Sequence, residues 1–216
     1  MRKYLYLAAV AASAAVVVLP AATAYAASNV LTISKTGGTS VKTSAVLTSG
    51  LAKGTSAVFS LGSEKLTCKA SKLSATVKTN PAKPGTATES LAAPSFATCT
   101  VNVTGVTFKS IKFANVPYKL SVSDATGFPV KVSEQSSTKP ILVTVTVTFQ
   151  GNAVVCTYKA SSVSGHASNT GNSIAFSKQK LSLKTGALCP ASANFSATYG
   201  PVVDSSVTGS PKVFVN

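Results

Sequence analysis

The titratable side chains that could carry acid–base chemistry are few and widely spaced. His166 is the one histidine, in a polar segment that we expect to be a surface loop. A hydrolase triad would need this histidine as its base, but the chain has no G-x-S-x-G nucleophile turn. The five acids are Glu64, Glu89, Asp124, Glu134 and Asp204. None pairs locally with another, although this excludes a glycosidase only weakly, because glycosidase carboxylates can come from distant segments.

Three short motifs match patterns of the penicillin-recognising serine hydrolases. Ser136 and Lys139 have S-x-x-K spacing, residues 184–186 are K-T-G, and residues 192–194 are S-x-N. In that family the serine opens a helix, which places serine and lysine one turn apart. Here Pro140 follows the lysine, a clear strand pattern follows the proline, and K-T-G precedes S-x-N, against the family's order. We therefore interpret the matches as chance.

No cluster of side chains has the spacing of a metal or cofactor site. The chain has one histidine, no closely spaced cysteine pair and no dense acidic loop. We therefore predict no catalytic residue, no metal ligand and no cofactor.

The first residues have the pattern of a secretory signal peptide. A short basic region precedes an apolar stretch that ends at Leu19, and residues 24–26 (Ala-Tyr-Ala) form a small-x-small cleavage pattern. An uncleaved membrane anchor is the alternative, but the apolar stretch is short for a bilayer span. We predict that residues 1–26 are a signal peptide, that residues 27–216 are secreted, and that no transmembrane segment remains after cleavage.

All the positively charged side chains of the predicted mature chain are lysines. Cleavage removes Arg2 and Lys3, which lowers the formal net charge from +15 to +13 and leaves no arginine. Arginine reads guanine edges and clamps phosphates with two hydrogen bonds, so we expect no sequence-specific nucleic acid partner.

Many of the lysines alternate with apolar neighbours, which places them on the outer faces of predicted strands. These are Lys65, Lys69, Lys72, Lys78, Lys119, Lys131, Lys159, Lys180 and Lys184. Such faces favour solubility and discourage strand pairing between molecules. The alternative is a basic surface that binds anionic polymers or membranes of the cell envelope.

The clearest secondary-structure pattern is a central hairpin. Apolar residues at every second position from Ile141 to Phe149 predict a strand with one buried face. A Gln-Gly-Asn link at residues 150–152 predicts the turn into a second strand, which carries Cys156. The same two-residue period recurs through most of the mature chain, and no apolar residues recur at helical spacing over three turns. We predict an all-β fold, a Greek-key β-sandwich.

Three segments interrupt this alternation. Residues 80–94 are rich in proline and residues 161–172 are polar, so we predict two exposed loops, where a partner would bind. Residues 133–140 are the best candidate for an internal boundary within the single secreted unit.

The four cysteines form two similarly spaced pairs. Cys68 precedes Cys99 by 31 positions, and Cys156 precedes Cys189 by 33, with a strand and then a loop in each case. This matched spacing predicts a duplication. The pseudo-repeats cover about residues 57–104 and 147–198. Four cysteines allow three pairings, and a duplicated unit would carry its own bridge, so we predict Cys68–Cys99 and Cys156–Cys189 in an oxidising compartment.

The signal peptide, paired cysteines and strand alternation resemble immunoglobulin-like secreted domains in style, but the chain has no tryptophan and its cysteine spacing is short for that family. In composition and layout the chain is also similar to small secreted β-rich proteins of Gram-positive actinobacteria whose roles are not established. This second resemblance carries over no functional residue.

We expect a non-enzymatic extracellular or envelope-associated protein with a binding or structural role and a lysine-rich surface. Its partner would be an anionic envelope polymer or another surface component. The alternative is a small secreted hydrolase with dispersed catalytic residues. A concave pocket where acids or His166 converge would favour the hydrolase, whereas scattered, solvated acids would favour the binding protein.

We expect the exported protein to begin at Ala27, because signal peptidase recognises the small residues Ala24 and Ala26. N-terminal sequencing of protein purified from the culture medium measures this start directly. A secreted product that still begins at Met1 would contradict the prediction.

Overall fold

The computed structural model describes residues 28–216, and within this range every regular element is a β-strand. The predicted signal peptide, residues 1–26, and its cleavage site lie outside the described residues. The all-β prediction is confirmed, and so are the two disulfides, Cys68–Cys99 and Cys156–Cys189. No stretch of the described chain forms a helix that could span a membrane.

The strands vary from two residues to 16 residues in length. In chain order they are β1 (Leu31–Ile33), β2 (Thr39–Ser40), β3 (Val46–Gly50), β4 (Ala57–Leu61), β5 (Glu64–Thr79), β6 (Thr86–Leu91), β7 (Ser95–Val101), β8 (Val106–Ala114), β9 (Tyr118–Ser123), β10 (Pro129–Ser133), β11 (Ile141–Phe149), β12 (Asn152–Ala160), β13 (Ser162–Ser168), β14 (Ser173–Thr185), β15 (Ser192–Tyr199), β16 (Val203–Asp204) and β17 (Val213–Val215).

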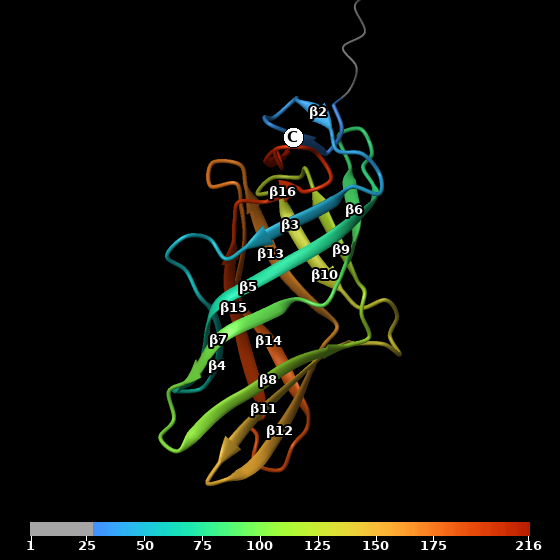
Figure 1. The fold of residues 1–216 in the computed structure, drawn as a ribbon. Helices are drawn as coiled ribbons and strands as arrows, with labels where there is room; N and C mark the ends of the chain where they lie inside the picture. Colours follow the sequence, from blue (N-terminus) through green and yellow to red (C-terminus); the bar gives the residue numbers. More distant parts are fainter. Residues whose placement is uncertain (1–27) are drawn as a thin grey trace, which may run out of the picture.

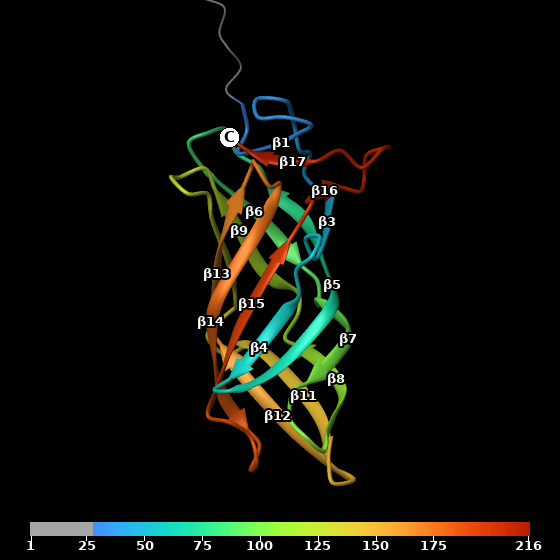
Figure 2. The same cartoon turned by 90° about the vertical axis from the view of Figure 1, so that its left-hand side faces the viewer.

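The larger sheet folds back on itself. Its hydrogen-bonded path runs β13-β10-β9-β6-β5-β4-β15-β14, and β14 pairs again with β13, which closes the circuit. Figures 1 and 2 show β6, β9 and β10 on one side of the molecule and β13, β14 and β15 on the other. Side chains from both sides share one hydrophobic core. Two facing layers around one core fit a sandwich, and the Greek-key connection stays a prediction.

The two ends of the elongated molecule differ. A small sheet, β17-β1-β2, covers one end, near the C-terminus (Figure 1). At the opposite end β12, β11 and β8 extend beyond the closed circuit (Figure 2). Among the described strands β7 pairs with β5 alone and β8 with β11 alone, so the sheet is not continuous between β7 and β8. The two layers therefore stand apart at this end.

Strand β5 changes its buried face partway along its 16 residues. Leu66 and Cys68 are buried, but further along the buried positions are Ser71, Ala75 and Val77, so the side-chain parity shifts by one. The first part of β5 pairs with β4 and β7, and the second with β3 and β6. The structure has one continuous strand across this change of face.

The central hairpin is present, with a tighter turn than predicted. β11 and β12 pair in register from Ile141 opposite Ala160 to Phe149 opposite Asn152. Gln150 and Gly151 alone form the turn, and both have positive φ, 49° and 80°. Positive φ at both central residues defines the type I′ turn that suits the right-handed strand twist.

The prediction that residues 80–94 form a loop is wrong, because β6 lies within it. This strand points Ala87, Glu89 and Leu91 into the core and pairs with both β5 and β9. A glutamate at the middle inward position removes the apolar alternation by which sequence patterns identify strands. Apolar alternation therefore cannot identify this strand from the sequence.

The prediction that residues 161–172 form a loop is wrong for a related reason. Most of the segment is β13, which closes the circuit between β10 and β14. Its buried positions are Val163 and Gly165, and a glycine gives no hydrophobic signal. A Cβ at Gly165 would collide with Ala175 O and lie 2.8 Å from the Phe176 ring, so the close approach of β14 requires glycine here.

The internal boundary and the two pseudo-repeats stay predictions. β4 and β15, one from each repeat, pair directly in a single sheet.

Gly165→Ala should lower the free energy of unfolding by roughly 1–3 kcal/mol, because the added methyl group overpacks the β13–β14 contact. Gly50→Ala is the matched control, since a Cβ there meets nothing closer than Ser71 O at 3.9 Å. Denaturant unfolding of both variants measures the difference. Equal stability of the two variants would refute the packing constraint.

Candidate functional site

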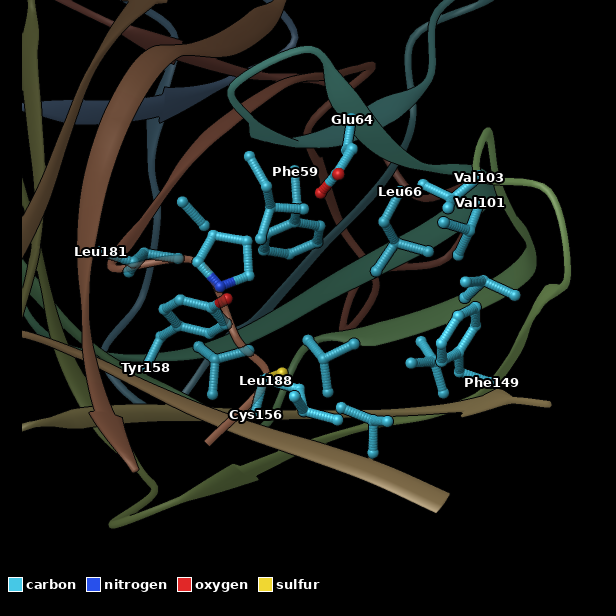
Figure 3. Close-up of a pocket in the computed structure, with 18 residues that line it drawn as sticks. Phe59, Glu64, Leu66, Val101, Val103, Phe149, Cys156, Tyr158, Leu181 and Leu188 are labelled. Atoms are coloured by element: carbon cyan, nitrogen blue, oxygen red, sulfur yellow. The ribbon is translucent and has the colours of Figure 1, made fainter. Parts of the chain in front are cut away.

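An apolar cleft of about 350 Å³ lies between the two layers at the end where they separate. One wall comes from β4, β5 and the segment that joins β7 to β8, and the other from β11, β12 and the loop of residues 186–191 (Figure 3). Its lining side chains are apolar apart from Glu64, the hydroxyl of Tyr158 and the disulfide-bonded Cys156. Such a lining resembles that of small-molecule sites, which are mostly apolar with a few placed polar groups.

The inward face of β11 forms much of the second wall of this cleft. Ile141 and Val143 are fully buried, but Val145 and Val147 are only half-buried, and Phe149 is 38% exposed. The sequence pattern predicts one uniformly buried face for these residues. The face is directed inward as predicted, but nothing covers its second half, because β7 and β8 are not joined above it.

The first disulfide holds one wall. Cys68 in β5 lies directly opposite Cys99 in β7, next to Leu66 and Val101, which both line the cleft. This bond fixes β7 to β5 where β7 has no other strand partner.

The second disulfide holds the loop of residues 186–191 against the other wall. It joins Cys156 in β12 to Cys189 in this loop, which brings Leu188 and Pro190 to the cleft. Gly186 has a φ of 134°, and a Cβ there would collide with Cys189 Sγ, so the loop can pack onto the bridge only with glycine at this position. Leu188 is 75% exposed at the rim.

Three buried tyrosines differ in their hydrogen bonding, and the one at the cleft is unsatisfied. The Tyr199 hydroxyl bonds Ser71 Oγ at 2.9 Å, and the Tyr118 hydroxyl donates to Ala114 O at 2.7 Å. Tyr158 is 2% exposed, and its hydroxyl has no partner in the described structure. Buried polar groups are nearly always hydrogen-bonded, so this unpartnered hydroxyl is a candidate contact for a bound water or ligand.

Glu64 contributes the one charged group of the cleft lining. Figure 3 shows its carboxylate and the Tyr158 hydroxyl directed into the cleft from different walls. Burial raises the pKa of Tyr158 to about 12, and the negative charge of Glu64 adds to that shift. The phenol is therefore neutral at physiological pH and able to donate a hydrogen bond.

The sequence-predicted chemical groups do not converge on this cleft. His166 is exposed in β13, with Nδ1 3.2 Å from Gly127 O. Ser136 and Lys139 lie in a turn, where Lys139 N donates to Ser136 O, and not on a helix as the hydrolase motif requires. The described residues contain no group of three histidine, cysteine or acidic side chains that could hold a metal ion.

The other four acids lie in separate settings. The Gly85 N–H donates a bifurcated hydrogen bond to both carboxylate oxygens of Asp124, 3.1 Å from each, and buried Asp204 accepts one from Ser206 N. Glu134 is half-buried. Glu89 is buried at the closed end of the core, beside a small cavity of about 40 Å³ that Asn172 also lines.

Sequence analysis could not identify the site residues. Tyr158 and Val145 have the alternating pattern of any core-facing strand residue, and Glu64 is one of several isolated acids. What these three residues share is that they line the cleft. The cleft forms through the pairing of strands that are far apart in the sequence, so a local pattern does not reveal it.

The nine lysines predicted to face outward are all exposed. They lie on strands around the molecule and none lines the cleft.

Comparisons with protein-family models, with curated proteins and with solved structures found no match to this chain.

Glu89 should make the protein less stable as the pH rises. Burial raises the pKa of its carboxyl from 4.5 to about 7, so the folded chain holds a proton that the unfolded chain releases between these values. The free energy of unfolding should therefore fall between about pH 4.5 and pH 7, by up to about 3 kcal/mol.

Glu89→Gln should remove this dependence and be more stable than the wild type at pH 8. Glu64→Gln is the control, because it removes an exposed carboxyl. Urea unfolding across this pH range measures both variants. An unchanged pH slope in Glu89→Gln would contradict the assignment.

Proposed function

We propose that this chain is an exported, non-enzymatic binding protein that holds an apolar ligand in the cleft between its two layers. The observation that carries the proposal is the cleft itself. Its volume of about 350 Å³ is more than twice that of a ~150 Å³ cavity that binds benzene. It falls within the range of roughly 300–1,000 Å³ common for small-molecule sites.

The rim of the cleft supports this role. Phe149 and Leu188 leave 38% and 75% of their surface exposed next to an already apolar lining. Burying apolar surface contributes roughly 25 cal/mol per Å², so a ligand that covers these side chains would gain affinity from them. Isolated exposed apolar residues are common, but here they border one concave surface.

The composition of the cleft favours binding over hydrolysis. Glu64 is the one acid among its lining residues, and no histidine or cysteine thiol accompanies it. A hydrolase would need a nucleophile and a base, or two carboxylates, within reach of one substrate bond. A small secreted hydrolase stays the alternative function, and it would need residues outside this cleft.

The setting we propose is extracellular, with attachment to the cell envelope through the lysine-rich exterior. Two disulfides suit an oxidising compartment, and the described residues contain no membrane-spanning helix. Exposed lysines on several strands suit an anionic envelope polymer or another anionic surface component, which the exterior would bind while the cleft stays open.

The cleft should bind the neutral apolar dye N-phenyl-1-naphthylamine, with a saturable rise in fluorescence. Val154 lines the cleft, whereas Val155, next to it in β12, is 49% exposed and is not among the lining residues. Val154→Trp should fill part of the cleft and weaken dye binding at least tenfold, and Val155→Trp should bind as the wild type does.

Titration of the three proteins with dye measures these affinities, and circular dichroism checks that each is folded. No saturable binding to the wild type, or equal weakening by both substitutions, would refute the proposed function.

A further inference from the structure

We infer that the ligand of the cleft is an uncharged amphiphile, an apolar body of roughly a dozen heavy atoms with a carbonyl-type oxygen that accepts a hydrogen bond from Tyr158. This inference rests on the proposed function and specifies the chemistry of its ligand. The size follows from scaling the ~150 Å³ cavity that holds benzene to about 350 Å³.

The Tyr158 hydroxyl provides the polar contact. It is the one buried tyrosine hydroxyl of the described chain without a partner, and it points into the cleft (Figure 3). The hydroxyl is already shielded from water, so a ligand oxygen placed against it would satisfy it, whereas a purely apolar ligand would leave it unsatisfied as it is in the unliganded protein. A buried unpaired donor of this kind should separate the two ligands by roughly tenfold in affinity.

Glu64 disfavours an anionic ligand. No lysine lines the cleft, so a ligand carboxylate would meet a like charge with no cation to offset it. A cationic head group would lose its hydration in this apolar cleft, and its ion pair with the exposed Glu64 would offset little of that loss. An uncharged head group avoids the repulsion and still satisfies Tyr158.

The apolar body has a defined path. From Tyr158, which lies opposite Val143, the lining continues along β11 over Val145 and Val147 to Phe149 at the rim. This lining is apolar throughout, so the ligand's single polar group belongs at the Tyr158 end.

Four probes that share a phenylalkyl body test the head group. They are methyl 4-phenylbutanoate, pentylbenzene, 4-phenylbutanoate and 4-phenylbutylamine, each used to displace N-phenyl-1-naphthylamine at pH 7. The wild type should bind the ester roughly tenfold more tightly than pentylbenzene, and should bind the carboxylate most weakly.

Two variants assign the contacts. Tyr158→Phe should bind the ester and pentylbenzene equally, with unchanged affinity for pentylbenzene. Glu64→Gln should narrow the gap between carboxylate and ester and leave pentylbenzene unaffected. A thermal melt accompanies each variant, and Tyr158→Phe should melt no lower than the wild type, because it removes an unsatisfied buried hydroxyl.

The outcomes separate the two proposals. If the dye does not bind, the proposed function fails. If dye and pentylbenzene bind but the wild type does not prefer the ester, the cleft is apolar only and the inference fails alone. Tightest binding of the amine would also overturn it in favour of a cationic ligand. The wild-type comparison stands even if a variant does not fold.

Discussion

The separation of the two layers at one end is the constraint on which the rest of the structure depends. Where layers face each other closely, side chains from both bury one another, and that mutual burial stabilises the fold. At the cleft this contribution is missing, since β11 faces an open space beyond Val143. Each wall is held by a disulfide instead, Cys68–Cys99 on one side and Cys156–Cys189 on the other. In the chain-entropy model, closing loops of this length contributes roughly 3–4 kcal/mol each. The cross-links therefore stand where hydrophobic packing is weakest.

At the closed end, asparagine side chains form hydrogen bonds with backbone groups that have no partner in a neighbouring strand. Asn80 accepts a hydrogen bond from Leu31 N and donates to Leu31 O and Val41 O, all within 2.9 Å. Asn169 bonds both the N–H and the C=O of Val215. Short terminal strands leave many backbone groups without ladder partners, and these amides satisfy some of them. They fix the small sheet over the core and leave the opposite end as the open one.

The sequence predicts the fold class and the disulfides because those depend on local features. Valine-rich alternation is sufficient to predict β11, and the matched spacing of the cysteines predicts their pairing. It misses β6 and β13 because their inward positions hold Glu89 and Gly165, which have no apolar signal. It also cannot reveal the cleft. Alternation shows that Val145 and Tyr158 share a face, but whether that face meets another layer depends on strand pairings far away in the chain.

The cleft is fixed by its surroundings, which bears on how it would bind. Closing it would require the loop of residues 186–191 to move inward, but Cys189 ties that loop to β12 and Gly186 packs against the bridge. On the other wall, β7 is bonded covalently to β5 beside Leu66 and Val101. Both walls are therefore ordered before a ligand arrives, and binding need not order a loop, which is a large part of the free-energy cost of association. The same bonds that compensate for the missing packing thus keep the cleft open, so its apolar lining and the unpaired Tyr158 hydroxyl stay in place for a ligand.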